Sequence, residues 1–87
     1  MPKIQKEITI MNHQGLHARP AAMFVQIAAK YEANITVQKG QEKVNGKSIM
    51  GILMLGAQHK SNVVLTADGK DAQAAMAELE GFLSKSE

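Results

Sequence analysis

The chain contains no cysteine and no tryptophan, and its only aromatic side chains are those of Phe24, Tyr31 and Phe82. Without cysteine it forms no disulfide, no thiolate zinc site and no cysteine nucleophile. Three scattered aromatic side chains offer no platform for stacking nucleic-acid bases. The longest uncharged apolar run, residues 48–57, is far shorter than the ~20 residues that cross a bilayer. The first residues contain no apolar signal segment. We therefore expect a cytoplasmic protein without membrane insertion.

Charge of one sign is also scarce, since ten basic and eight acidic residues leave a net charge of +2. That charge is too small for a nucleic-acid binding surface and fits weak attraction to an acidic protein. The 87 residues predict one domain, residues 1–87, and a monomer. So short a chain has no room for an enclosed substrate chamber and shows no nucleotide-binding glycine motif. We therefore expect neither an independent enzyme nor a bound cofactor.

Hydrophobic periodicity predicts the element order β-α-β-β-α-β-α. Alternation of apolar and polar residues predicts strands over residues 4–10, 34–38, around 44 and 63–67. Helical spacing predicts helices from about residue 18 to 30, over 49–55 and over 72–83. Two long helices can cover one face of a four-stranded antiparallel sheet and leave its other face in water. The predicted fold class is therefore α+β.

Each long helix has one face that is expected to pack on the sheet. In the first helix this face consists of small residues: Ala18, Ala21, Ala22, Val25, Ala28 and Ala29. A different face of the same helix carries Arg19, Met23, Gln26 and Lys30. In the last helix the buried face consists of Ala72, Ala75, Met76, Leu79, Phe82 and Leu83.

The segment from Gly15 to Pro20 places His17 at or just before a helix N-terminus. Glycine permits the turn, and proline is tolerated in the first helical turn. Unpaired backbone N–H groups there bind an anion, and Arg19 can clamp the same anion. The helix end also disfavours a positively charged imidazole, so His17 suits the role of phosphoryl acceptor. The alternative from these six residues alone is an ordinary solvated histidine.

A metal site is not expected. His13 and His17 are four residues apart, which suits two metal ligands only on a helix. Gly15 and the predicted loop argue against a helix there, and no carboxylate or cysteine is near in sequence. We expect His13 and His59 to be surface residues.

Ser48 is predicted to cap the short apolar helix that follows it. Ile52 and Leu55 are expected in the core. The opposite side, expected to be exposed, consists of Ile49, Met50 and Leu53. A phosphate on Ser48 would sit favourably at the helix N-terminus and weaken docking of a partner to that side. Core packing remains the alternative for the three exposed residues.

The segments 15–21 and 46–56 resemble HPr, the histidine phosphocarrier family of the bacterial phosphoenolpyruvate-dependent phosphotransferase system. The resemblance covers essentially the whole chain, with both motifs at the family's spacing. It implies an open-faced β-sandwich and a relay in which enzyme I phosphorylates His17 on Nδ1. Enzyme IIA domains then receive the phosphoryl group for sugar uptake, and Arg19 assists both transfers.

The resemblance also implies a regulatory site and docking residues. Ser48 matches the serine that an ATP-dependent HPr kinase/phosphorylase modifies in many bacteria. The residues that match partner-docking positions, or share a face with them, are Met23, Gln26, Lys30, Ile49, Met50 and Leu53. His17 distinguishes the chain from regulator-only relatives that lack the histidine. Two alternatives stay open: a regulatory, nitrogen-type phosphorelay without sugar transport, and a pure protein-binding regulator.

Overall fold

Four strands form one antiparallel sheet, in the order β1-β4-β2-β3, within residues 2–85, which are the residues described by the computed structural model. The strands are β1 (Lys3–Thr9), β2 (Asn34–Lys39), β3 (Glu42–Asn45) and β4 (Asn62–Asp68). The helices are α1 (Ala18–Ala29), α2 (Ile49–Leu55) and α3 (Ala72–Ser84). The predicted order β-α-β-β-α-β-α is confirmed.

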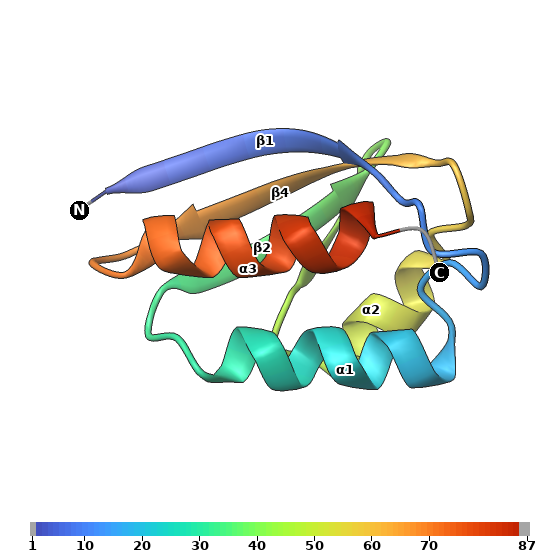
Figure 1. Cartoon of the computed structure of the whole chain (residues 1–87), viewed down its shortest axis with the longest axis horizontal. Coiled ribbons are helices and arrows are strands. Elements are labelled where there is room, and N and C mark those ends of the chain that lie inside the picture. Colours follow the sequence, from blue (N-terminus) through green and yellow to red (C-terminus); the bar gives the residue numbers. More distant parts are fainter. Residues whose placement is uncertain (1, 86–87) are drawn as a thin grey trace.

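The helices lie on one side of the sheet, and the other side carries none of them (Figure 1). Side chains alternate along each strand, so one face of the sheet is apolar and the other is polar. On the polar face Gln5 of β1 donates a hydrogen bond to Thr66 of β4 at 3.1 Å. Lys6 lies on the helix side, where its ammonium group reaches Glu80 of α3 at 2.9 Å. This is the open-faced α+β sandwich that the sequence predicted.

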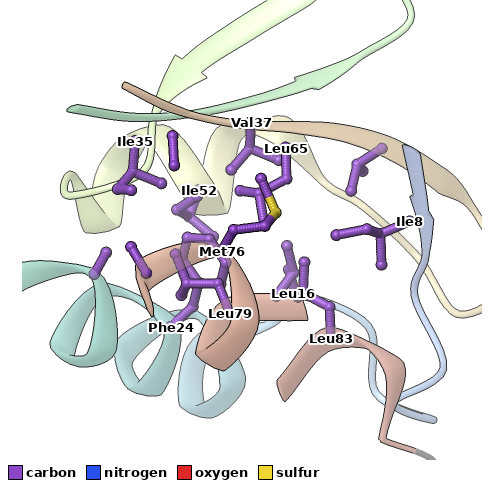
Figure 2. Close-up of a cluster of buried hydrophobic side chains, with 14 of the residues drawn as sticks. Ile8, Leu16, Phe24, Ile35, Val37, Ile52, Leu65, Met76, Leu79 and Leu83 are labelled. Carbon is purple, nitrogen blue, oxygen red and sulfur yellow. The ribbon is translucent and has the colours of Figure 1, made fainter. Parts of the chain in front are cut away.

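The core fills the space between the sheet and the helices (Figure 2). Its largest fully buried side chains are Phe24, Ile10, Ile35, Ile52, Leu65, Leu79, Leu83, Val37 and Val63. The predicted packing face of α1 is confirmed at Ala21 and Ala28, which are buried, but Ala18 and Ala29 are exposed and the ring of Phe24 is 0% exposed. Alanines are tolerated on either face of a helix, whereas one large ring loses most by facing water. The single phenylalanine therefore sets the rotation of α1.

The predicted faces of the other helices agree better with the structure. In α3, Phe82 is only half-buried, at the end of the helix, and the other five predicted residues are buried. In α2, Ile52 and Leu55 are buried as expected. That helix ends at Gly56, which adopts the left-handed conformation (φ 63°) that glycine tolerates.

Candidate functional site

His17 is the N-cap residue of α1, as the sequence predicted. Gly15, two residues earlier, has φ +65°, a left-handed conformation, and a Cβ on it would lie 2.6 Å from the Ala57 oxygen and 3.0 Å from the Gln58 Cα. Leu16 is buried, and its amide donates to the carbonyl oxygen of Ala57 at 2.8 Å. These contacts fix the loop on both sides of the turn, so the chain enters α1 with the His17 side chain exposed.

The end of α1 offers backbone donors beside His17. The first bond of the helix runs from the amide of Ala21 to the carbonyl oxygen of His17 at 2.7 Å. The amides of Ala18 and Arg19 precede that bond, and Pro20 has no N–H group. The His17 side chain makes no capping bond to the helix. Two backbone donors and the positive end of the helix dipole therefore stand next to an exposed imidazole.

His17 shares a surface hollow of about 190 Å³ with residues that follow it by some forty positions. The hollow is lined by Leu16, His17, Leu53, Gly56, Ala57 and Gln58. The two sequence motifs, one around His17 and one on α2, thus meet at one place on the surface. Leu53 is 39% exposed, so it forms an apolar rim beside the imidazole.

Arg19 lies in the first turn of α1 but borders a different and larger cavity, of about 520 Å³. That cavity is lined by Asn12, Gln14, Arg19, Pro20, Met23, Phe82 and Lys85. Arg19 is exposed and forms no ion pair with any residue from 2 to 85. Its guanidinium is therefore available to a ligand or partner. The contribution of Phe82 and Lys85 was missed, because no local pattern shows that the end of α3 returns to this loop.

Ser48 caps α2 as predicted. Its Oγ accepts a hydrogen bond from the amide of Gly51 at 3.1 Å, and the residue is half-buried. The predicted exposed side of α2 is confirmed by exposed fractions of 41% for Ile49, 64% for Met50 and 39% for Leu53. Met54, which is 67% exposed, was not singled out from the sequence. Its position one turn after Met50 is the signal that could have found it.

The proposed docking residues of α1 are also on the surface. Met23, Gln26 and Lys30 border a shallow groove of about 230 Å³ together with Ile27. Lys30 does not stand free, because its ammonium group pairs with the Glu78 carboxylate of α3 at 2.8 Å. The exposed surfaces of α1 and α2 therefore differ in character, and only the surface of α1 includes a charged pair.

The Glu78 carboxylate of α3 bonds to Lys30 and Tyr31 at the end of α1, and these bonds shift the pKa of all three groups. Hydrogen bonds from Lys30 and from the Tyr31 hydroxyl lower the pKa of Glu78. The same bonds raise the pKa of Lys30 and of Tyr31. Nearby, the amides of Glu32 and Ala33 donate to the Asp71 carboxylate, at 2.9 and 2.8 Å, and lower its pKa. These contacts connect α1, β2 and α3 at the end of α1 that is remote from His17.

The rings of His13 and His59 are in an edge-to-face arrangement, with their centroids 4.9 Å apart and an interplanar angle of 67°. His13 is exposed and His59 is half-buried. Residues 2–85 contain no group of three or more potential metal-ligating side chains. Within the same residues, none of the helices has the length and apolar character needed to span a bilayer.

Comparison with known proteins identifies the family of the chain. The model of the family described as "PTS HPr component phosphorylation site" matches residues 4–85. The HPr-like protein Crh of Halalkalibacterium halodurans is 40% identical over 82 residues, which are 94% of this chain and 98% of that protein.

Solved structures agree in fold as well. The phosphocarrier protein HPr of Bacillus anthracis has a TM-score of 0.92 and 38% identity, over 95% of this chain and 99% of that one. Crh of Bacillus subtilis, solved as a domain-swapped dimer, has a TM-score of 0.75 and 38% identity, over 92% of each chain. The chain therefore belongs to the HPr family of the phosphotransferase system, and HPr proteins are phosphocarriers rather than independent catalysts.

Proposed function

We propose that His17 accepts a phosphoryl group on Nδ1 from enzyme I and passes it to enzyme IIA domains for sugar uptake. The observation that carries this proposal is the exposed imidazole at the N-terminus of α1, next to the free amides of Ala18 and Arg19. Phosphoenolpyruvate is the ultimate donor. The proposal places the exchange in the cytoplasm, where that metabolite is made.

In the transfer step, the lone pair of Nδ1 forms a bond to phosphorus while the bond from phosphorus to the donor breaks. The donor keeps that electron pair, and the reverse sequence delivers the group to the acceptor. Negative charge on the phosphoryl oxygens is stabilised by the two free amides and by the helix dipole. Arg19 supplies a positive charge from the same helical turn. The chain thus provides the nucleophile and the anion-binding groups.

Partner docking is proposed on the exposed residues of α1 and α2. Leu53 lines the same hollow as His17, so a partner that covers α2 comes within reach of the imidazole. Burial of the neighbouring Ile49 and Met50, which are 41% and 64% exposed, would stabilise such a complex. The positive charge of Arg19, which pairs with no residue from 2 to 85, favours an acidic partner surface.

Regulation is proposed at Ser48 by an HPr kinase/phosphorylase. A phosphate there would lie at the N-terminus of α2, whose dipole and amides tolerate an anion. It would also lie beside Ile49, where a dianion weakens apolar docking. The fold is therefore expected to survive the modification while the affinity for enzyme I falls.

A second candidate is a regulatory role without sugar transport, either in a nitrogen-type phosphorelay or as a protein-binding regulator. The similarity to Crh, described in Bacillus subtilis as a catabolite repression protein, favours it. In the pure binding role, Ser48 and the exposed side of α2 matter and His17 does not. Phosphoryl transfer to His17 therefore separates this role from the carrier roles.

We propose that the carrier works as a monomer of one domain, residues 1–87, because all groups of the site come from one chain. Crh of Bacillus subtilis forms a swapped dimer, so size-exclusion chromatography with light scattering is the relevant check. A stable dimer that carries phosphate as well as the monomer does would overturn this part of the proposal.

The test is incubation with enzyme I and labelled phosphoenolpyruvate. We expect an acid-labile phosphate on the natural chain and on His13→Ala, a matched control for removal of one loop histidine. His17→Ala is expected to carry none. An unlabelled natural chain would eliminate the carrier roles, and a label that persists in His17→Ala would move the site elsewhere.

A further inference from the structure

Methionines dominate the exposed apolar surface of residues 2–85. Three of the five large hydrophobic residues that are exposed there are Met23, Met50 and Met54, with exposed fractions of 47%, 64% and 67%. By contrast, Met76 is 2% exposed in the core. A thioether is the one apolar side chain that mild oxidants convert into a polar one. The composition of this surface therefore makes it chemically sensitive as well as apolar.

Met50 and Met54 are one helical turn apart on α2, so they lie on the same side of that helix. Leu53 is next to Met54 in sequence and three residues after Met50, and it lines the hollow that contains His17. The two thioethers thus flank the apolar rim of the proposed phosphoryl-transfer site. Neither contributes to the core, which α2 reaches through Ile52 and Leu55.

We propose that Met50 and Met54 are sites of reversible oxidation by peroxides, and that sulfoxide formation at them slows phosphoryl exchange by weakening partner docking. This inference rests on the proposed function, because it needs α2 to be covered by enzyme I. It adds a redox-sensitive modification to a surface whose regulation is otherwise assigned to Ser48.

The chemical step is balanced with hydrogen peroxide as the oxidant. The sulfur lone pair attacks one peroxide oxygen, the O–O bond breaks, and a proton shift releases one water molecule. Sulfur is oxidised by two electrons and peroxide is reduced by two. Methionine sulfoxide reductases reverse the change.

The product places a polar S–O group where the partner removes water. A polar group buried without a hydrogen-bond partner costs enough to lower kcat/KM on the order of tenfold. The fold is expected to persist, because the buried side of α2 keeps its contacts and its Ser48 cap. The effect should therefore appear in transfer and not in thermal stability.

The experiment treats the full chain with dilute hydrogen peroxide and maps sulfoxides by peptide mass spectrometry. Transfer from enzyme I is measured before and after treatment, and again after incubation with methionine sulfoxide reductases. We expect Met50 and Met54 to oxidise before Met76, a roughly tenfold slower transfer, and recovery on reduction.

The double variant M50L/M54L is compared with its own untreated rate, since leucine keeps the apolar volume without the sulfur. For this variant we expect the transfer rate after peroxide treatment to be close to its rate before treatment. The proposal is overturned if Met76 oxidises as fast, if the oxidised natural chain transfers at its untreated rate, or if the double variant slows equally. Untreated protein that accepts no phosphate contradicts the proposed function instead, so the two failures are distinguishable.

Discussion

The amide of Leu16 donates to the carbonyl oxygen of Ala57 at 2.8 Å and joins the loop that carries His17 to the loop that follows α2. This backbone hydrogen bond links the two sequence motifs. It holds His17 and Leu53 at one hollow, although they are far apart in sequence. The position of the His17 imidazole relative to the proposed docking surface on α2 therefore depends on how closely these two loops approach each other.

A substitution at Gly15 tests whether the close contact between these two loops matters. A Cβ on Gly15 would lie 2.6 Å from the Ala57 oxygen, and the residue has φ +65°. Gly15→Ala is therefore expected to lose more than about 2 kcal/mol of stability in urea denaturation and to slow phosphoryl transfer. Gly40→Ala is the matched control, because Gly40 has φ +62° and no atom within 4 Å of its Cβ position. Equal losses in the two variants would show that the close approach is unimportant.

Arg19→Glu is expected to leave the thermal unfolding midpoint near that of the natural chain, because Arg19 is exposed and pairs with no residue between 2 and 85. Transfer from enzyme I should slow on the order of tenfold or more, since a charge-assisted hydrogen bond to the phosphoryl group is lost. Lys43→Glu on the edge strand β3 makes the same charge change away from the site. Unchanged rates in Arg19→Glu would remove Arg19 from the mechanism.

Ser48 caps α2 and is also the proposed modification site, and the two roles can be tested separately. Ser48→Ala removes the acceptor of the Gly51 amide and should cost about 1 kcal/mol in thermal or chemical unfolding. Ser48→Asp keeps a capping oxygen and adds a charge, so it should retain near-natural stability while its affinity for enzyme I falls. An Asp variant that unfolds would contradict the half-exposed placement of this side chain, and one that binds normally would contradict the regulatory role.

The pH dependence of stability should reflect the Glu78 cluster and Asp71. Folding lowers the pKa of Glu78 and Asp71 below their ordinary values of 4.5 and 3.8, so their contributions are complete above those values and are lost as the pH falls. Folding raises the pKa of Lys30 and Tyr31 above 10.5 and 10.0, so those contributions are lost as the pH rises further.

Unfolding midpoints measured from pH 2 to 11 are therefore expected to decline at both ends of the range. Glu78→Gln should make both declines shallower, because it removes the charge that Lys30 pairs with and that holds the Tyr31 proton. Asp71→Asn should change mainly the acid side. A Glu78→Gln profile parallel to that of the natural chain would show that the cluster does not set the pH dependence.

Local patterns predicted most of the fold for identifiable reasons. Alternation along β1 and β4, the Ser48 cap, and Gly56 as the end of α2 are all decided by neighbouring residues. The packing face of α1 was predicted only in part: Ala21 and Ala28 are buried, but the many alanines leave the helical phase open, and Phe24 decides it. The size of the Phe24 side chain, rather than the number of alanines, indicates which face of α1 packs on the sheet.

In the candidate site, too, some features follow from neighbouring residues and others depend on segments that are far apart in sequence. His17 at a helix N-terminus follows from Gly15 and Pro20, which act locally. The shared hollow of His17 and Leu53 depends on contacts between segments some forty residues apart. The cavity beside Arg19 likewise depends on the return of α3 to the loop before α1. Neither juxtaposition leaves a periodic or motif signal in one sequence.

The central claim is that one ring nitrogen of His17 carries the phosphoryl group. Nuclear magnetic resonance of ¹⁵N-labelled protein, recorded while enzyme I and phosphoenolpyruvate maintain phosphorylation, observes the three histidines directly. We predict phosphorus coupling at Nδ1 of His17, with the nitrogen signals of His13 and His59 uncoupled to phosphorus. Phosphorus on another residue, or on no histidine at all, would contradict it.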